Sequence, residues 1–363
     1  MSAAAGAASS VKSALRQFRK AFLAVLKGCG VSSAVFSSDW RRKRLLILCY
    51  HGISIEDEHE WLPRTYMTQS MLRSRFEIIR RAGCAVLPLS EAIERLYSGK
   101  LPHKAVAITF DDGGFDFYCR AFPVIREFQF PVSVYQTTYY ADFHAPIFNL
   151  ACSYMLWKSR NRALAASPSF GLRETIRLDL EAGRKFALQA LVSFAESQNL
   201  SGTGKDELAW QLAEALGFDY RKFQARRLLQ LMNAAEIAEL SGQGIDFQLH
   251  THRHRTPDDE VLFRKEIRDN RDRLREISGH DAVHFCYPSG VFQMKNLPWL
   301  AAEGVVSATT CQPHLASKAN HPLLLPRFVD TSARSPIEFE SWLAGVASLI
   351  TLRKPARAAA AYR

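Results

Sequence analysis

The chain has 363 residues, of which 47% are hydrophobic and 23% are charged, and its formal net charge is +11. This composition indicates a globular protein with a large buried core and excludes a mostly disordered chain. The excess of positive charge favours an anionic partner, such as an acidic glycan, a phospholipid surface or a lipid-linked sugar phosphate. Because the basic residues are spread out rather than gathered in a compact block, we expect no nucleic-acid partner.

The seven cysteines are scattered, form no CxxC pair and are odd in number. They predict neither a disulfide framework nor a zinc site built from thiolates, and they fit a reducing compartment. The start of the chain does not read as a secretion signal, and no stretch approaches the roughly 20 apolar residues that a membrane span needs. We therefore expect a cytoplasmic location, with association at the inner membrane surface as an alternative.

Both ends carry basic amphipathic patterns. Residues 1–43 form a predicted arm in which Leu15, Phe18, Phe22 and Leu26 share one helical face among basic residues, and residues 346–363 form a basic tail. Two interpretations stay open. The terminal helices dock on the body of the protein, or they make peripheral contact with an anionic membrane.

Between the ends, short apolar runs predict buried strands, separated by segments with helical spacing. The predicted strands cover residues 44–54, 84–90, 104–114, 130–138, 244–250, 283–290, 304–310 and 323–330. This alternation predicts an α/β fold with a parallel sheet over residues 44–345, closed as a barrel of about seven strands. From about 149 to 240 the pattern is mostly helical, which indicates an insertion.

Polar residues follow several of these predicted strands, where a βα barrel carries its chemistry. Asp111 and Asp112 end the strand 104–114 and precede two glycines. Neighbouring strand residues point to opposite sides, so one carboxylate could bind a metal while the other faces substrate or water. The alternative is a solvated turn that contains two acids.

Three histidines, at positions 250, 252 and 254, follow the strand 244–250. In an extended chain His250 and His254 would lie on the order of 13 Å apart, too far to share one ion. However, Thr256 as an N-cap and Pro257 in the first helical position predict a helix that starts almost at once. The chain then turns, so His250 and His254 converge and His252 is left as the spare. Exposed or structurally satisfied histidines are the alternative.

Two histidines and one aspartate make a facial site for one divalent metal ion with open positions for water and substrate. Zinc suits these ligands, although iron, cobalt, nickel and manganese also accept imidazole and carboxylate. Such an ion can polarise a carbonyl and lower the pKa of bound water.

At these positions the sequence resembles the polysaccharide deacetylases, the NodB-homology group or carbohydrate esterase family 4. The resemblance rests on TFDDG at 109–113, on the H-(S/T)-x-x-H pattern at 250–254, on YHGI at 50–53 and on CYPSG at 286–290. It implies a distorted (β/α) barrel that removes N-acetyl groups from an amino-sugar polysaccharide or glycolipid precursor. Asp111 would then be the general base, and Asp112, His250 and His254 the metal ligands, with metal-bound water attacking the acetamide carbon. The turn at Tyr287 and Pro288 would contact substrate or supply an oxyanion donor.

The sequence departs from the family pattern in two places. The arginine that usually orients the catalytic aspartate is missing from the segment 283–290, and Arg327 on the last strand is a candidate for its role. The histidine that usually acts as general acid has no clear match, which leaves His314, His321 and His51 as candidates. These departures keep alternatives open. They are an O-acetyl esterase or small-molecule amidohydrolase on the same metal site, and a non-catalytic glycan-binding protein. The oligomeric state is not indicated.

Overall fold

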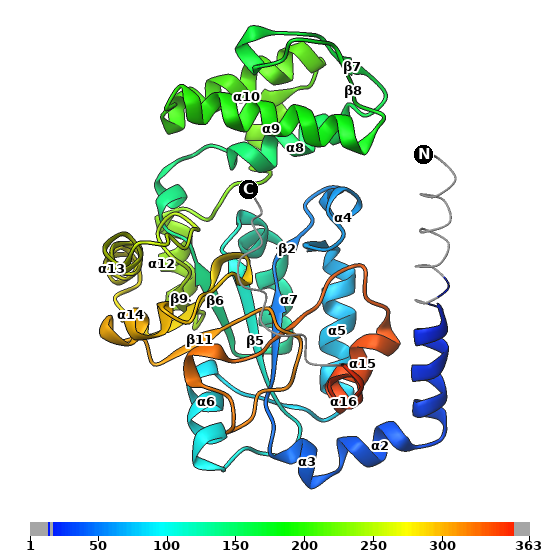
Figure 1. Cartoon of the computed structure of the whole chain (residues 1–363). Helices are drawn as coiled ribbons and strands as arrows, with labels where there is room; N and C mark the ends of the chain where they lie inside the picture. Colours follow the sequence, from blue (N-terminus) through cyan, green and yellow to red (C-terminus); the bar gives the residue numbers. More distant parts are fainter. Residues whose placement is uncertain (1–13, 15–16, 352–363) are drawn as a thin grey trace.

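A curved parallel sheet forms the centre of the molecule in a computed structural model that describes residue 14 and residues 17–351 (Figure 1). Seven parallel strands follow one another in the order β11-β10-β9-β6-β5-β1-β12, and β4 pairs with the start of β5. They curl through 246°. The predicted distorted (β/α) barrel is therefore confirmed, with strands shorter than the predicted runs. The strands are β1 (Leu46–Tyr50), β4 (Ala85–Val86), β5 (Ala105–Asp112), β6 (Val132–Gln136), β9 (Asp246–Leu249), β10 (His284–Cys286), β11 (Ser307–Thr309) and β12 (Phe328–Val329).

Helices cover the outside of this sheet. The apolar faces of most of these helices share one large core with one face of the sheet, whereas α6 packs in a separate cluster with Ile47, Ala105 and Ala107 from the other face. β1 and nearly all of β5 are buried. The covering helices are α5 (Gln69–Arg81), α6 (Leu89–Ser98), α7 (Phe122–Phe128), α12 (Ala234–Gly242), α13 (Glu260–Ser278), α14 (Asn296–Ala302), α15 (Pro336–Ala344) and α16 (Val346–Ile350). Shorter elements are α2 (Val31–Phe36), α3 (Asp39–Arg42), α4 (Glu58–Trp61), the strand pair β2 (Gly52–Ile53) and β3 (Tyr66–Met67), a π-helix at Phe117–Ala121 and 3-10 turns at Tyr139–Asp142, Pro288–Gly290 and Pro322–Leu324.

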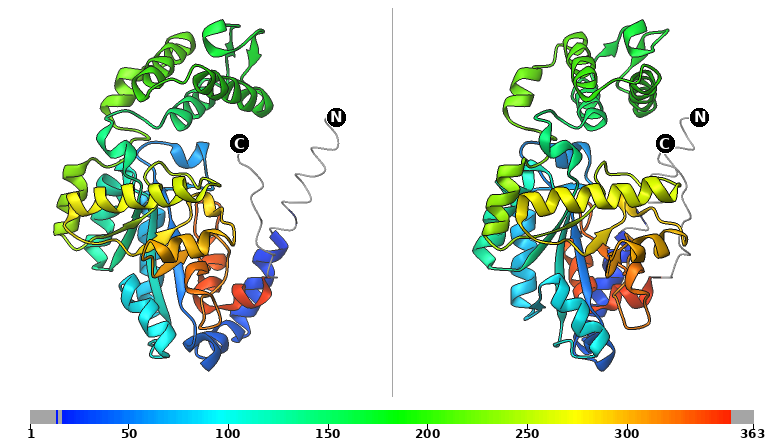
Figure 2. Two further views of the ribbon diagram at one scale, coloured as in Figure 1. Left: turned by 60° about the vertical axis from the view of Figure 1, so that its left-hand side comes forward. Right: turned by 90° about the vertical axis from the view of Figure 1, so that its left-hand side faces the viewer.

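A second group of helices stands over the carboxyl end of β5, as Figures 1 and 2 show. It contains α8 (Phe148–Lys158), α9 (Glu181–Ser197), α10 (Gly202–Leu216), α11 (Tyr220–Ala225), a 3-10 turn at Pro168–Phe170 and the antiparallel pair β7 (Ala163–Leu164) and β8 (Ile176–Arg177). These elements bury a separate apolar core that extends to Leu229. The Gly114–Leu231 bridge ties the chain leaving this group to the end of β5. The last helix of the predicted span 149–240, α12, packs against α13 instead.

The helix over residues 17–28 lies against the carboxyl-terminal helices. Leu23 is buried with Ala344 and Val346. Phe18 and Phe22, which belong to the predicted apolar face, are 72% and 43% exposed. Positions 1–13, 15 and 16 of that arm, and therefore Leu15, lie outside the described residues, as do positions 352–363 of the tail. Among the described helices, none combines the length and apolar character required to cross a bilayer.

One predicted boundary is wrong. The helix after the histidines, α13, begins at Glu260 and not at Pro257, because Asp259 rather than Thr256 caps it: the Asp259 side chain accepts the Leu262 N–H. The turn that carries the histidines is therefore longer than predicted.

Candidate functional site

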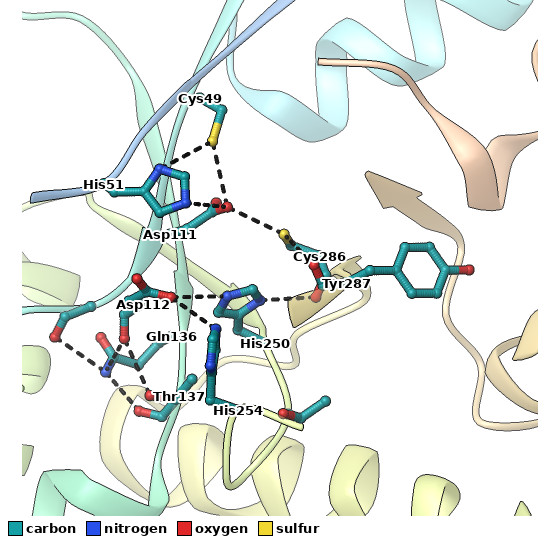
Figure 3. A network of polar contacts seen from close by, with 12 residues as sticks. Cys49, His51, Asp111, Asp112, Gln136, Thr137, His250, His254, Cys286 and Tyr287 are labelled. Atoms are coloured by element: carbon teal, nitrogen blue, oxygen red, sulfur yellow. Dashed lines mark hydrogen bonds and ion pairs between the residues drawn. The ribbon is translucent and has the colours of Figure 1, made fainter. Parts of the chain in front are cut away.

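Asp111 and Asp112 project in different directions from the end of β5 (Figure 3). Asp112 has a positive φ of 71° and Gly113 one of 78°, so the strand breaks at this point. A Cβ at residue 113 would lie 1.9 Å from the Gln136 amide oxygen on β6. The left-handed backbone favours glycine here, and any larger residue would also have to displace the end of the Gln136 side chain. The break separates the two carboxylates.

Asp112 faces the two histidines that the sequence analysis selected. Its Oδ1 lies 3.2 Å from the Nε2 of His250 and 3.2 Å from the Nε2 of His254. Burial of Asp112 works against ionisation, but the nearby imidazoles outweigh it and hold the pKa of the carboxyl well below its usual range. The ligand atoms of these three residues lie within 4.8 Å of one another, close enough to share one ion.

A tight turn brings His250 and His254 together. Thr251 and His254 both have left-handed backbone, with φ of 61° and 54°, and the Thr251 hydroxyl accepts the Arg255 N–H. The two imidazole centroids are 4.9 Å apart. His252 points elsewhere, because its Nδ1 is 2.8 Å from the Thr138 hydroxyl. The structure therefore separates His252 from the other two histidines, as the predicted turn requires.

The hydrogen bonding of His250 tests whether a cation fits between these groups. Its Nδ1 lies 2.9 Å from the Cys286 carbonyl oxygen, which can only accept, so Nδ1 carries the proton. In the neutral ring Nε2 then presents a lone pair toward the Asp112 oxygen. Two acceptors at 3.2 Å repel each other unless a proton or a cation lies between them. The donor set therefore fits a metal ion, and the Cys286 carbonyl would orient His250 as one of its ligands.

Metal content gives a test with a matched pair of variants. We expect the purified chain to bind about one zinc ion and His254→Ala to weaken that binding about 100-fold or more, since losing even a group that only orients a ligand costs about 10- to 100-fold. His252→Ala should bind zinc close to the wild-type level. Competition with a chromophoric chelator measures both. Equal losses in the two variants would contradict the assignment of His254.

Asp111 forms a buried ion pair with Arg327. The Nη1 and Nη2 atoms of Arg327 lie 2.7 and 2.8 Å from the two carboxylate oxygens, and the Arg327 side chain is 0% exposed. Burial alone would raise the pKa of Asp111, but the guanidinium outweighs it and holds the pKa well below its usual range. The structure thus places Arg327 where an orienting group would act.

Two thiols complete the surroundings of Asp111. The Sγ atoms of Cys49 and Cys286 each lie 3.4 Å from Oδ2 of Asp111. Burial raises the pKa of both thiols well above the ordinary value, so they are neutral and can donate to the carboxylate. Asp111 is therefore fixed by four contacts, two from Arg327 and two from thiols.

The structure separates the three proton-donor candidates. The Nε2 atom of His51 lies 3.6 Å from Oδ2 of Asp111, and His51 lines the same cavity. His314 contacts Ser348 on α16, with its Nδ1 2.6 Å from the hydroxyl. His321 accepts the Leu323 N–H at the turn Pro322–Leu324. His51 is therefore the candidate that the fold brings to the aspartates.

Tyr287 points away from the aspartates and histidines (Figure 3). Its hydroxyl donates to the Leu323 carbonyl and its N–H donates to the Thr309 carbonyl. Pro288, which follows it, is buried and has no N–H to donate. Ser289 is the residue of this turn that lines the cavity. The Tyr287 ring, hydroxyl and N–H are thus engaged away from the cavity, and a contact of this turn with substrate or an oxyanion stays a prediction.

Asn270 on α13 supports the site and was missed from the sequence. Its Oδ1 accepts the His250 N–H, while its Nδ2 donates to the Gln136 carbonyl and to the Thr138 hydroxyl. It is 0% exposed. The sequence does contain a sign of this role. Asn270 lies three residues after Ile267 and four before Leu274, on the buried face of an amphipathic helix, where a side-chain amide needs hydrogen-bond partners.

A cavity of about 590 Å³ opens onto these groups. Asp111, Asp112, His250, His254 and His51 lie in its wall, together with residues from β2, the insertion and Asp116. Asp116 accepts the Ile53 N–H. Burial of the carboxyl and repulsion from Glu58 and Asp112 raise the pKa of Asp116, whereas the hydrogen bond from Ile53 lowers it. The raising effects are larger, so the pKa is about 7.

This raised pKa predicts a pH-dependent stability. An acid whose pKa is higher in the folded chain keeps its proton longer there, so stability falls as pH rises from about 4 to about 7. In the metal-free protein, Asp116→Asn should remove this loss. Relative to wild type, the free energy of unfolding of Asp116→Asn should increase by roughly 2 kcal/mol between pH 4 and pH 8. This is about half of what the rise in pKa would give for a carboxyl fully shielded from water, because the Asp116 carboxyl is partly in contact with water. Urea unfolding at both pH values measures it, and a pH-independent difference would show that folding does not raise the pKa of Asp116.

Comparison with known proteins adds a sequence match in the second half of the chain. Residues 206–305 match the family model described as polysaccharide deacetylase, a stretch that contains the histidines of the site but not the aspartates. Over 100 residues, or 27% of this chain, the sequence is 33% identical to poly-beta-1,6-N-acetyl-D-glucosamine N-deacetylase of Escherichia coli strain K12. The match spans 15% of that protein. The same figures hold for the protein of that description from Escherichia coli O157:H7.

Solved structures share the fold over most of the chain. The deacetylase PplD of Streptococcus pyogenes, in complex with acetate, covers 81% of this chain and 96% of its own length, with a TM-score of 0.54 and 17% identity. IcaB from Ammonifex degensii covers 84% and 97%, with a TM-score of 0.51 and 16% identity. A de-N-acetylase from Aggregatibacter actinomycetemcomitans covers 82% and 99%, with a TM-score of 0.51 and 12% identity. At these identities the likeness is one of fold.

Proposed function

We propose that this chain is a member of the polysaccharide deacetylase family and acts as a metal-dependent N-deacetylase of a polymer or glycolipid that contains N-acetylglucosamine. The family and the similar proteins are hydrolases of carbon–nitrogen bonds, and one of them is described as acting on poly-beta-1,6-N-acetyl-D-glucosamine. The observation that carries the proposal is the pairing of Asp112, His250 and His254 in one cluster beside an Asp111 held by Arg327.

The metal ligands would be Asp112, His250 and His254. We propose zinc, because two imidazole nitrogens and one carboxylate oxygen suit it and leave a position open. When bound, such an ion would act as a Lewis acid on the acetyl carbonyl and on water. The ligands come from β5 and from the turn after β9, so the sheet itself sets their spacing.

Asp111 would accept a proton from the attacking water. A carboxylate with a depressed pKa is ionised at neutral pH, so it is always ready to accept, and Arg327 fixes its plane. Oδ2 accepts from Arg327 and from both thiols, whereas Oδ1 accepts from Arg327 Nη1 and keeps a second lone pair, which can take a water proton while the guanidinium bonds stay in place.

His51 would supply the proton that the departing amine needs. Its ring lines the same cavity as Asp111, with Nε2 3.6 Å from Oδ2 of Asp111 and Nδ1 3.8 Å from the Cys49 sulfur. A proton taken up by Asp111 from water can therefore pass to Nε2 of His51 and from there to the amine nitrogen. Both groups stand at carboxyl ends of neighbouring strands, since β1 pairs with β5.

The assay is acetate release from N-acetylglucosamine oligomers by the zinc-loaded chain, compared with the chelated chain and with an O-acetylated sugar. We expect acetate from the N-acetyl substrate, loss after chelation and recovery when zinc is returned. Release from the O-acetyl sugar alone would replace the proposal with an esterase. Binding of oligomers without any release, under zinc, cobalt, nickel, iron and manganese, would replace it with a glycan-binding function.

The charge and the amino-terminal helix bear on where the protein acts and on what it contacts there. We propose a cytoplasmic location at the inner membrane surface, because the chain is strongly basic and Phe18 and Phe22 are exposed on its amino-terminal helix. Anionic lipid or a lipid-linked sugar would then meet the side of the molecule that carries the described parts of both terminal segments (Figure 1).

A further inference from the structure

A second cavity lies beside the candidate active site. It has a volume of about 240 Å³ and lies between residues 139–149 and the helices α9 and α10 of the insertion. Tyr140 and Asn149 line both this cavity and the one that contains the aspartates and histidines. The two cavities are therefore neighbours with these two side chains in common.

The lining of this second cavity has the chemistry of a sugar site. Tyr139, Tyr140 and Phe143 form an aromatic side, with the Tyr139 and Phe143 ring centroids 5.1 Å apart. Lys205 and Glu196 bring charged groups from α10 and α9. Aromatic rings cover the flat C–H faces of a pyranose, while its hydroxyls need donors and acceptors.

Of the charged side chains that line the cavity, Asp206 has a hydrogen-bond partner within the protein, whereas the charges of Lys205 and Glu196 are not paired with any described residue. Asp206 accepts from the Tyr220 hydroxyl at 2.7 Å, which fixes its carboxylate in place. Within the part of the chain that the structure describes, Lys205 makes no ion pair closer than 4.0 Å and Glu196 makes none either. Their charged groups are therefore available to hydroxyls of a bound sugar.

The aromatic side is held by the turn that carries the metal ligands. The Tyr139 N–H donates to the His252 carbonyl at 2.8 Å, and the Arg253 guanidinium lies 5.0 Å from the Tyr139 ring centroid. His252, which the metal site does not use, also holds Thr138 through its Nδ1. The turn thus fixes the position of the proposed ligand His254 and also that of Tyr139 in the aromatic side. Because the aromatic side is held in this way, the second cavity is pre-formed.

The insertion closes the cavity from the other side. A Cβ at Gly202, the first residue of α10, would lie 3.0 Å from the Phe143 ring, so the helix start packs directly on that ring. The separate core of the insertion keeps α9 and α10 together. The insertion is therefore placed to contact a substrate beyond the reacting unit.

We propose that this second cavity is a subsite for a pyranose unit of the substrate chain, next to the unit that is deacetylated, so that the insertion makes the enzyme prefer longer oligomers. This inference rests on the proposed function. A single sugar or a short oligomer would fill the cavity at the metal ligands only, and a longer oligomer would fill both.

The test compares Phe143→Ala with Phe186→Ala, on N-acetylglucosamine dimer and hexamer. Phe143 is 38% exposed and lines the cavity, whereas Phe186 on α9 is 53% exposed and lines neither cavity. Wild type should have a higher kcat/KM for the hexamer than for the dimer. Phe143→Ala should lose about fivefold to tenfold on the hexamer, mainly through KM, and stay within about twofold on the dimer. Phe186→Ala should match wild type on both.

Three results would overturn the subsite. They are equal losses of Phe143→Ala on both oligomers, no loss on the hexamer, or a wild type that releases acetate in a zinc-dependent way without any length preference. Absence of acetate release from wild type would count against the proposed function instead. Hexamer binding measured by calorimetry then decides the subsite: weaker binding in Phe143→Ala than in Phe186→Ala supports it, and equal binding overturns it.

Discussion

Asp111→Asn is expected to lower kcat for acetate release by about 10³- to 10⁴-fold, the upper part of the range for a positioned acid–base group. The asparagine keeps the size of the side chain and one oxygen for the Arg327 guanidinium, but it cannot accept a proton from water. Since Asp112, His250 and His254 are unchanged, zinc binding should stay close to the wild-type level. The measurement is single-turnover acetate release with zinc in excess.

The variant needs a check on its fold, because it leaves a buried guanidinium beside a neutral amide. Circular dichroism and the zinc content together provide that check. A folded, zinc-loaded Asp111→Asn that keeps more than about one tenth of the wild-type kcat would remove Asp111 from the role of base.

Arg327→Met is expected to destabilise the fold by about 3–5 kcal/mol. Arg327 and Asp111 have side chains that are 0% and 2% exposed, and each charge is compensated mainly by the other. Methionine fills much of the same volume but leaves the carboxylate without its partner, so the pKa of Asp111 should rise. Urea unfolding measures the loss in free energy of unfolding, and the pH dependence of acetate release should show an added acidic limb as Asp111 becomes protonated.

The double variant Asp111→Asn with Arg327→Met separates pairing from packing. If the ion pair dominates, the double variant should be more stable than the sum of the two single losses predicts, by roughly 2 kcal/mol or more. Additive losses would mean that the two side chains contribute through packing alone, and the orienting role of Arg327 would lose its basis.

The local parts of the site could be predicted from the sequence. The aspartates follow a buried strand directly, and His250 and His254 are four residues apart, so strand ends and a turn suffice to place them. Even so, the helix start used for that argument was misplaced by three residues, from Pro257 to Glu260. The convergence depends instead on the left-handed backbone of Thr251 and His254, which is uncommon outside glycine and least expected of all for the β-branched Thr251.

The distant parts could be proposed only as candidates. Arg327 is 216 positions from Asp111 in the sequence, and it reaches Asp111 because β12 and β5 flank β1, with Leu48 in register with both Phe328 and Ile108. The choice of proton donor among His51, His314 and His321 also depends on the order of the strands, because the pairing of β1 with β5 brings His51 beside Asp111. The direction of the Tyr287 ring could not be predicted either, since an aromatic residue after a strand can point to the site or into the core, where this ring lies.

The most direct measurement is anomalous diffraction at the zinc edge from crystals of the zinc-loaded protein. We predict one peak, bonded to a carboxylate oxygen of Asp112 and to the Nε2 atoms of His250 and His254, with His252 bonded to Thr138 and Arg327 paired with Asp111. A peak that His252 coordinates in place of His254, or an ion bound between Asp111 and the thiols of Cys49 and Cys286, would contradict the account.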